Sequence, residues 1–352
     1  MTNINTLGID LAKNIFQLHG IDSKGNTVLK KRIKRDKFAE YIANLPPCLI
    51  GMEACGGAHF WANKFVEMGH TVKIMAPQFV KPYVKSNKND ARDAEAICEA
   101  VGRPNMRFVP IKKPEHQDMQ MLHRIRSQAV KQRTALSNQL RGFLAEYGVV
   151  IAKGINAVRK NLWLIIEDAE NALTYKSREL FAELYDEFKK LDERVKHYDK
   201  EIADIAKSNP TCKRLMEVEG VGPKTATAMW CTVTQPELFK NGRCVAAFLG
   251  LVPKQHSSGG KTILLGISKR GDRYLRTLLI HGARNLVRYS ERRSTPRQRW
   301  IHNKSVRSHK NKTAVAVANK NVRILWALMR REEVYRPMVD ENAACLPQGT
   351  QA

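Results

Sequence analysis

Four acidic residues among the first hundred positions carry the strongest chemical signal in the sequence. Asp10 stands in the middle of the apolar stretch TLGIDLA, and Glu53 ends a second apolar stretch, LIGMEAC. A carboxylate at such a place is costly to bury without a partner. Asp90 and Asp93 are three residues apart, so they would share one face of a helix. Converging carboxylates repel one another unless cations lie between them, and the four acids therefore predict a site for Mg²⁺ or Mn²⁺.

Each acid taken alone also has an ordinary explanation. Asp90 or Asp93 could cap a helix, and Glu53 could pair with a lysine. Asp10 fits such an explanation least, because its neighbours are apolar. Taken together, the acids favour a site in which two cations about 4 Å apart stabilise the attacking and leaving oxygens of a phosphodiester.

A second candidate site is the run Ser257-Ser258-Gly259-Gly260, for which we expect a flexible loop with an exposed hydroxyl. Nearby cations could clamp the phosphate that this loop meets: Lys261, Lys269, Arg270, Arg273 and Arg276. A serine hydroxyl is a weak nucleophile until a base or a metal activates it. His256 is not assigned as that base, because neighbours in a loop usually point apart. From the chemistry alone, the loop is more simply a phosphate-binding element than a nucleophile.

The run EGVGPKTA predicts a helix-hairpin-helix element. Gly220 and Gly222 would form its turn, and backbone N–H groups at the start of the next helix, near Lys224, could hold a phosphate. A Gly-x-Gly between helices can also be no more than a tight turn. The basic surroundings favour phosphate contact, which positions a duplex without reading its sequence.

The acids need a scaffold, and short apolar runs between turn residues predict one. We expect strands at 5–11, 16–21, 27–33, 49–53 and 71–76, and helices at 36–45, 59–68 and 89–101. Three strands followed by alternating helices and strands are typical of an α/β ribonuclease-H-like domain, placed here at residues 1–110. Its strands and last helix would bring the four acids to one sheet edge.

Residues 111–212 are predicted to be a helical region and residues 213–340 a mainly α C-terminal domain. Long amphipathic helices are expected at 115–147 and 176–208, and from Phe188 the apolar spacing alternates between three and four residues. That spacing is typical of a coiled-coil seam. The seam could close within one chain or form a dimerisation arm, and we favour self-association.

Composition points to a nucleic-acid partner. The chain has 352 residues, with 60 Lys and Arg against 34 Asp and Glu, and residues 213–352 hold 26 basic and nine acidic side chains. Such a surface attracts polyanions. No apolar run approaches the roughly 20 residues of a membrane span, and the first residues, MTNINTLGID, predict no signal peptide. Seven cysteines without a CxxC pair suit a reducing cytoplasm and argue against a zinc finger or a disulfide framework.

The ordered runs GIDLAKNIF, GMEACGGAHFWA, NKNDARDAEAI, RTALSNQLRGFLAEYG, EGVGPKTA, GLVPKQHSSGGK and LLGISKRGDRYLRTLLIHGAR extend over nearly the whole chain. Together they resemble the insertion-sequence transposases of the one-ten family, in its eleven-eleven branch. The resemblance implies a Holliday-junction-resolvase-like first domain whose Asp-Glu-Asp-Asp set is Asp10, Glu53, Asp90 and Asp93, binding Mg²⁺. It also implies a serine that attacks a DNA phosphate and forms a 5′-phosphoserine link. This serine matches Ser258, with Ser257 as the alternative.

The resemblance further implies partners. Similar enzymes use a structured non-coding bridge RNA that pairs with both the element ends and the target DNA. They act as dimers that pair into a tetramer, in which the acidic site of one protomer meets the serine of another. Two other functions stay open: a metal-dependent nuclease or junction resolvase without a covalent step, and a nucleic-acid-binding protein without activity. The second of these leaves Asp10 unexplained.

Overall fold

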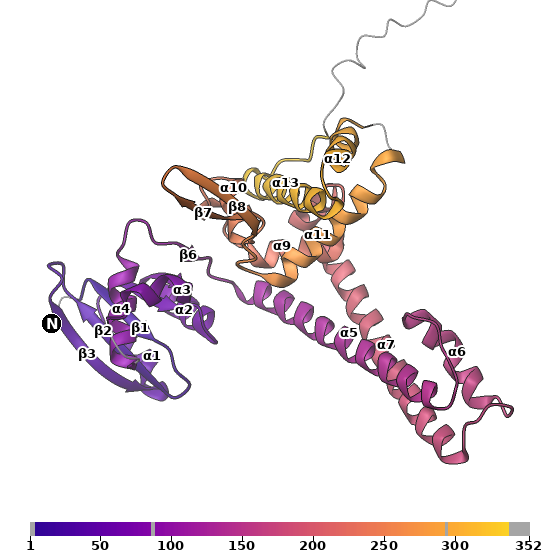
Figure 1. Cartoon of the computed structure of the whole chain (residues 1–352). Coiled ribbons are helices and arrows are strands. Elements are labelled where there is room, and N and C mark those ends of the chain that lie inside the picture. Colours follow the sequence, from indigo (N-terminus) through magenta and orange to yellow (C-terminus); the bar gives the residue numbers. More distant parts are fainter. Residues whose placement is uncertain (1–3, 86–88, 293–294, 338–352) are drawn as a thin grey trace, which may run out of the picture. The chain divides into compact units, whose positions relative to one another are not determined.

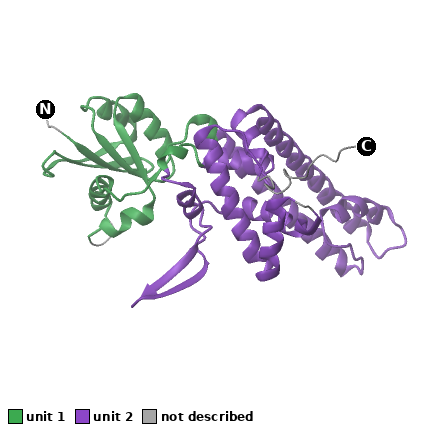
Figure 2. Cartoon of the chain, turned by 90° about the horizontal axis from the view of Figure 1, so that it is seen from above, with its two compact units in different colours: residues 1–117, 233–238 green, residues 118–232, 239–352 purple. Residues whose placement is uncertain are grey.

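The computed structural model describes residues 4–85, 89–292 and 295–337 (Figure 1). The chain forms two compact units (Figure 2). Unit 1 contains the described residues up to 117, together with 233–238, and unit 2 contains 118–232 and the described residues from 239 onward. The helical middle and the C-terminal region therefore belong to one unit. No helix in the described ranges combines the length and the apolarity that crossing a bilayer requires.

Unit 1 is a mixed α/β structure built on a six-stranded sheet in the order β3-β2-β1-β4-β5-β6. The strands are β1 (Thr6–Asp10), β2 (Ile15–Ile21), β3 (Thr27–Lys34), β4 (Leu49–Glu53), β5 (Thr71–Met75) and β6 (Phe108–Val109). The first three strands are antiparallel to one another, whereas β1, β4 and β5 run parallel. The five expected strands are confirmed within two residues at each end. The short β6, antiparallel to β5, was not predicted.

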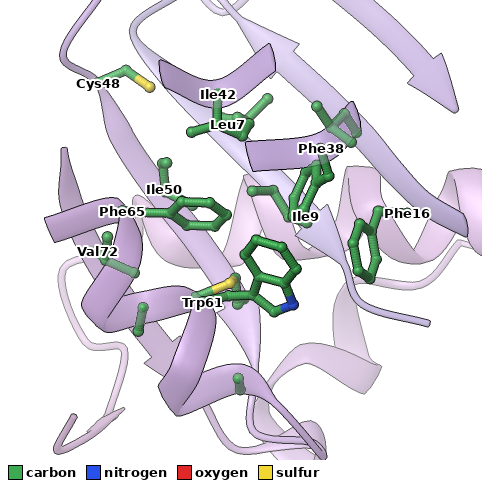
Figure 3. Packing of buried hydrophobic residues seen from close by; sticks show 14 of the residues in the cluster. Leu7, Ile9, Phe16, Phe38, Ile42, Cys48, Ile50, Trp61, Phe65 and Val72 are labelled. Atoms are coloured by element: carbon green, nitrogen blue, oxygen red, sulfur yellow. The ribbon is translucent and has the colours of Figure 1, made fainter. Parts of the chain in front are cut away.

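The helices of unit 1 also follow the prediction closely. They are α1 (Arg35–Ala43), α2 (Ala58–Glu67), α3 (Pro77–Val80), the 3₁₀ turn η1 (Lys81–Tyr83) and α4 (Asp90–Val101), and η2 (Pro236–Leu238) belongs to the same unit. Phe16, Phe38, Trp61 and Phe65 form an aromatic cluster between the sheet and the helices α1 and α2 (Figure 3). Edge-to-face contacts such as Phe38 on Trp61, with ring centroids 4.9 Å apart, add to the burial of these rings.

Two glycines let α4 lie directly on the sheet. A Cβ built on Gly8 of β1 would lie 2.3 Å from the carbonyl oxygen of Ala94, and one on Gly51 of β4 would lie 2.8 Å from Cβ of Val101. Any side chain at these positions would lift the helix off the strands. The glycines therefore set how closely α4 approaches β1 and β4.

Unit 2 contains the long helix α7 (Tyr175–Ser208) and, from Asp118 onward, the long helix α5 (Pro114–Glu146), both as expected, together with an unpredicted helix that lies between them in sequence, α6 (Ile155–Glu167). The seam of α7 is buried within the chain. Phe188 and Leu191 share a core with Leu136 and Leu140 of α5, and Ile202 packs in a second cluster with Met119 and Leu122. The intramolecular alternative thus accounts for most of the heptad spacing, and self-association stays a prediction.

The C-terminal part of unit 2 is mainly helical, as expected. Its elements are α8 (Pro210–Met216), α9 (Pro223–Thr232), α10 (Gly242–Phe248), β7 (Pro253–Ser258), β8 (Lys261–Ile267), α11 (Arg273–Arg288), η3 (Ser290–Arg292), α12 (Pro296–Arg307) and α13 (Lys310–Arg331). One expectation about local structure was wrong. The serine segment is not a loop but a β-hairpin, and it extends from the helices of its own unit (Figure 2).

Candidate functional site

The acids of β1 and β4 are neighbours at the carboxyl ends of two parallel strands. Ile9 is paired with Met52, so Asp10 and Glu53, the next residue of each strand, lie side by side. Side chains two residues apart share a face of a strand. Asp10 therefore shares a face with Gly8, and Glu53 with Gly51, and this is the face that α4 covers.

The other two acids lie in the first turn of α4. The side chain of Asn89 caps this helix by accepting a hydrogen bond from the backbone N–H of Ala91 at 3.0 Å. Oxygen atoms of Asp10, Asp90 and Asp93 all lie within 4.8 Å of one another. The structure thus brings Asp10 to Asp90 and Asp93, which are remote from it in sequence, at the spacing that one bound cation requires.

The pKa of Glu53 is affected by the same acidic cluster. Burial, followed by the charges of Asp10 and Asp93, raises the pKa of its carboxyl. Mutual repulsion of this kind is what a bound divalent cation relieves. The carboxylate-rich donor set suits a hard cation such as Mg²⁺ or Mn²⁺, which prefers oxygen ligands.

Two further features of the acidic site were missed by sequence reasoning. Cys55 lies near the acids, since burial and then the charges of Asp10 and Glu53 raise the pKa of its thiol. An open hollow of about 300 Å³ lies beside Asp10 and Asp90, and Lys13 and Arg32 also line it. Cations next to an acidic cluster are a usual arrangement where a phosphate must approach carboxylates. Nothing in the spacing of Lys13 and Arg32 along the chain signals this proximity.

The serine hairpin has a two-residue turn. Gly259 and Gly260 both have positive φ, +55° and +77°, as a type I′ turn requires. Ser258 ends β7 and is paired with Lys261 at the start of β8. Both serines are exposed, and their hydroxyls are open to a ligand from outside.

The strand geometry separates the two serines. Gln255 and Ser257 share one face of β7, and the amide of Gln255 donates a 2.7 Å hydrogen bond to the hydroxyl of Ser257. Ser258 shares the opposite face with His256 and with its cross-strand partner Lys261. The expectation that neighbours point apart holds for His256 and Ser257, but a strand places His256 and Ser258 on the same side.

Arg276 holds the base of the hairpin. It is 7% exposed, and its Nη1 donates hydrogen bonds to the carbonyl oxygens of Leu249, at 3.1 Å, and Arg270, at 2.6 Å. Leu249 precedes the hairpin and Arg270 follows it, so one guanidinium joins the two chain segments that enter and leave it. The other cations expected near the serines are exposed: Lys261, Lys269, Arg270 and Arg273.

The glycine turn between α8 and α9 is tightly packed. Gly220 has φ +81°, and a Cβ there would lie 2.9 Å from Leu286 of α11. Gly222 has open space around its Cα, and Lys224 forms an ion pair with Asp199 at 2.8 Å. The tight-turn alternative therefore accounts for Gly220, and Gly222 is the more accessible of the two glycines.

Comparison with known proteins gives consistent matches along the chain. A DEDD transposase model of the IS110 type, described as "Transposase", matches residues 7–149, and the model "Transposase IS116/IS110/IS902 family" matches residues 212–321. The chain is 48% identical to a "Probable family 20 transposase" of Pseudomonas aeruginosa, over 95% of this chain and 99% of the relative. It is 45% identical to the "Transposase for insertion sequence element IS1111A" of Coxiella burnetii, over 96% and 92% of the two chains. A third relative is the "Transposase for insertion sequence element IS1328" of Yersinia enterocolitica, 40% identical over 95% and 99%.

Proposed function

The chain belongs to the IS110/IS116/IS902 family of insertion-sequence transposases, enzymes that act on DNA, and from this premise we propose how its two sites divide the reaction. Unit 1, in our proposal a ribonuclease-H-like domain, supplies a divalent-metal site made by Asp10, Glu53, Asp90 and Asp93. The β7–β8 hairpin of unit 2 supplies Ser258 as the nucleophile. The observation that carries the proposal is the convergence of Asp10, Asp90 and Asp93 to within 4.8 Å.

The four acids have the chemistry of a site for Mg²⁺ or Mn²⁺. A cation bound there would stabilise negative charge on the phosphate oxygens during strand cleavage. The protein's own part is positioning: the paired ends of β1 and β4 hold Asp10 and Glu53, and the glycine-mediated contact of α4 holds Asp90 and Asp93 above them. Lys13 and Arg32, which line the adjacent hollow, would orient the phosphodiester.

The covalent step conserves the number of phosphoester bonds. The Oγ atom of Ser258 forms a bond to phosphorus while the bond from phosphorus to the 3′ oxygen breaks, and the hydroxyl proton is finally carried by that 3′ oxygen. The reverse step, with a different 3′ hydroxyl, rejoins the strand and frees the serine. No separate energy source is required, because each ester broken is replaced by another.

Ser258 is favoured over Ser257 by the geometry of the hairpin. Its face also carries His256 and Lys261, so an attacked phosphate would meet a cation and an imidazole on that side. The hydroxyl of Ser257 accepts a hydrogen bond from the amide of Gln255 on the opposite face of the strand. Four exposed cations would bind phosphates of the DNA backbone around the serine: Lys261, Lys269, Arg270 and Arg273. Gly222 and the backbone near Lys224 would contact a second phosphate.

We assign Arg276 a positioning role instead of phosphate contact. Its buried guanidinium donates hydrogen bonds to two backbone carbonyls and so holds the base of the hairpin that carries Ser258. The resemblance described above extends the proposal to partners: a structured bridge RNA pairs with the element ends and the target DNA, and the acids of one protomer act with the serine of another in a dimer that pairs into a tetramer. RNA guidance would leave the reading of sequence to base pairing.

The first test is covalent trapping. Purified full-length protein is incubated with Mg²⁺ and nicked or junction-bearing DNA, with and without RNA transcribed from the sequence that flanks the gene. We expect a slowly migrating protein–DNA band that needs the RNA, persists in Ser257→Ala and is absent in Ser258→Ala and Asp10→Asn. Cleaved ends without a covalent band, still lost in Asp10→Asn, would instead identify a metal-dependent nuclease.

A further inference from the structure

One face of α11 carries only polar and basic side chains. Exposed positions recur there every three or four residues, and we call these five residues the α11 stripe: Arg273, Thr277, His281, Arg284 and Arg288. With 3.6 residues per helical turn, the five positions fall within an arc of about 80° around the helix axis. The rise of the helix between Arg273 and Arg288 gives the stripe a length of about 22 Å.

Packing on the opposite face of α11 fixes the direction of the stripe. Leu279 and Leu286 are buried on that face. Gly282, about half a turn from Arg273 around the helix, packs against the turn between α8 and α9, and an added Cβ would lie 2.0 Å from the carbonyl oxygen of Gly220. Because the helix cannot rotate about its axis without breaking these contacts, the stripe faces away from that turn.

The positive charge of the α11 stripe is poorly balanced. The helix contains no Asp or Glu, and among the described residues no carboxylate lies within ion-pair distance of Arg273, Arg284 or Arg288. Asp272, the acid next to the helix, caps it by accepting a hydrogen bond from a backbone N–H of the first turn at 2.8 Å. Arg288 lies 5.5 Å from the ring centroid of Tyr289, a contact that leaves its charge in place. Such a row of like charges favours a bound polyanion.

The α11 stripe begins next to the base of the serine hairpin. Residues 268–272 are the whole connection between β8 and α11. Arg276, in the first turn of the helix, donates a 2.6 Å hydrogen bond to the carbonyl oxygen of Arg270, so it holds the start of the helix and the base of the hairpin together. The first cation of the stripe, Arg273, therefore adjoins the element that carries Ser258.

The shape of the α11 stripe favours a duplex. Each strand of duplex DNA carries one phosphate per about 3.4 Å of helix axis, so a straight row of about 22 Å matches about six base pairs. Proteins that hold single strands stack the bases on aromatic side chains. The stripe offers no Trp, Tyr or Phe for this purpose, whereas its three arginines are charged donors that suit phosphate oxygens.

We propose that the α11 stripe binds the phosphate backbone of duplex DNA next to the site of cleavage, with Arg273, Arg284 and Arg288 as the charged contacts. Such contacts position a duplex without reading its sequence. DNA is favoured over RNA because the chain belongs to a family of enzymes that act on DNA, and because the stripe adjoins the hairpin of Ser258. The inference rests on the proposed function in placing the cleaved phosphate at this hairpin.

The test measures binding of fluorescein-labelled duplex DNA of about 20 base pairs to the full-length protein, by fluorescence anisotropy at several salt concentrations. The double variant Arg284→Gln/Arg288→Gln should bind roughly tenfold more weakly than the parent. The slope of log K against log salt should fall by about 1.8, which corresponds to two lost phosphate contacts. Arg284→Lys/Arg288→Lys keeps both charges and should keep the slope. Gln and Lys are good helix formers, so the melting temperature of both variants should match that of the parent.

Lys190→Gln/Arg194→Gln is the matched control, because it removes two exposed charges at the same spacing from another helix of unit 2, α7. It should match the parent in affinity and in slope. Equal losses in the two Gln double variants, or a loss that is as large for duplex RNA or single-stranded DNA of the same sequence, would overturn the proposal. Binding requires no cleavage, so a covalent band that is missing in the parent would refute Ser258 as the nucleophile and leave the result for the stripe intact.

Discussion

Gly8 lies directly beneath the backbone of Ala94, so closely that a methyl group on Gly8 would stand 2.3 Å from the Ala94 carbonyl oxygen. Gly8→Ala should therefore push the start of α4 away from β1 and carry Asp90 and Asp93 away from Asp10. Overpacking of this kind typically costs about 1–3 kcal/mol. We expect a lower melting temperature and a loss of Mg²⁺-dependent strand cleavage larger than the loss of DNA binding.

Gly102→Ala is the control for this prediction. Gly102 follows α4, has φ −83° and has no atom within 4 Å of a Cβ built on it. Its replacement should leave both the melting temperature and cleavage unchanged. Normal cleavage by Gly8→Ala would show that the close contact of α4 with β1 does not position the acids.

Glu53 allows the proposed metal site to be tested without an activity assay. Its raised pKa, caused by burial and by the charges of Asp10 and Asp93, means that the folded protein loses stability as the pH rises through that pKa. In the presence of a chelator, Glu53→Gln should thus melt at a higher temperature than the parent at pH 7.5, and the difference should vanish near pH 4. Added Mn²⁺ should stabilise the parent more than the variant.

The exposed Glu67 on α2 provides the comparison, because Glu67→Gln removes a carboxylate of the same unit away from the cluster. It should match the parent with and without Mn²⁺. An equal Mn²⁺-induced rise in melting temperature for the parent and Glu53→Gln would exclude Glu53 from the metal site.

The acidic site could be foreseen from the sequence because each acid breaks a local pattern. Asp10 ends the apolar strand β1, and parallel strands bring their carboxyl ends to the same edge, so the proximity of Asp10 to Glu53 follows from the fold class. Lys13 and Arg32 could not be foreseen, since they share the hollow only after β2 and β3 fold back on β1. A strand pattern that fits several registers does not reveal such neighbours.

The serine segment was mistaken for a loop for a specific reason. Two glycines after two serines indicate flexibility locally, but the same Gly-Gly pair is also the preferred turn of a tight hairpin when strands flank it. The flanking strand β8, with the sequence KTILLGI, is exposed along most of its length. It therefore lacks the alternation of apolar and polar residues that indicates a strand.

The seam of α7 shows a different limit of sequence-based prediction. Its heptad spacing predicts a partner helix but does not identify α5 of the same chain as that partner.

We expect the carboxylate of Asp192 on α7 to provide the main electrostatic stabilisation of the contact between α7 and the helices α5 and α6. It is 4% exposed and accepts hydrogen bonds from Arg133 of α5 and Arg159 of α6, each at 2.7 Å. Burial alone would raise its pKa, but these contacts and Lys196 outweigh burial and lower the pKa to about 2. Asp192→Asn should lower the free energy of unfolding at pH 7 by about 3–5 kcal/mol, the usual cost of removing one partner from a buried pair.

The pH dependence has a defined sign. The stability that ionised Asp192 contributes is fully present above the pKa of an unfolded aspartate, about 3.9, and is lost as the pH falls through about 2. Urea unfolding at pH 7 and pH 3 should therefore show a smaller difference between parent and variant at pH 3. Asp186→Asn, at an exposed acid of the same helix, should have no measurable effect. A difference that is constant with pH would mean that Asp192 acts through packing alone.

Arg276 provides the sharpest test of how the serine hairpin is held. Arg276→Met removes both hydrogen bonds to the carbonyls of Leu249 and Arg270, so the hairpin should open more often at its base. We expect faster amide hydrogen exchange in β7 and β8, at least a tenfold slower formation of the covalent Ser258 adduct, and unchanged DNA affinity. Arg276→Lys should restore part of the rate, because a lysine can still donate to these carbonyls.

The matched control for that variant is Arg178→Met. Arg178 also donates to a backbone carbonyl, that of Ile166 at 2.6 Å, but it joins α6 to α7 far from the hairpin in sequence. Its loss should destabilise unit 2 to a similar degree and leave hairpin exchange and adduct formation unchanged. A drop in DNA affinity and in the salt dependence of binding for Arg276→Met would instead mean that Arg276 contacts a phosphate, because only a phosphate contact releases counterions.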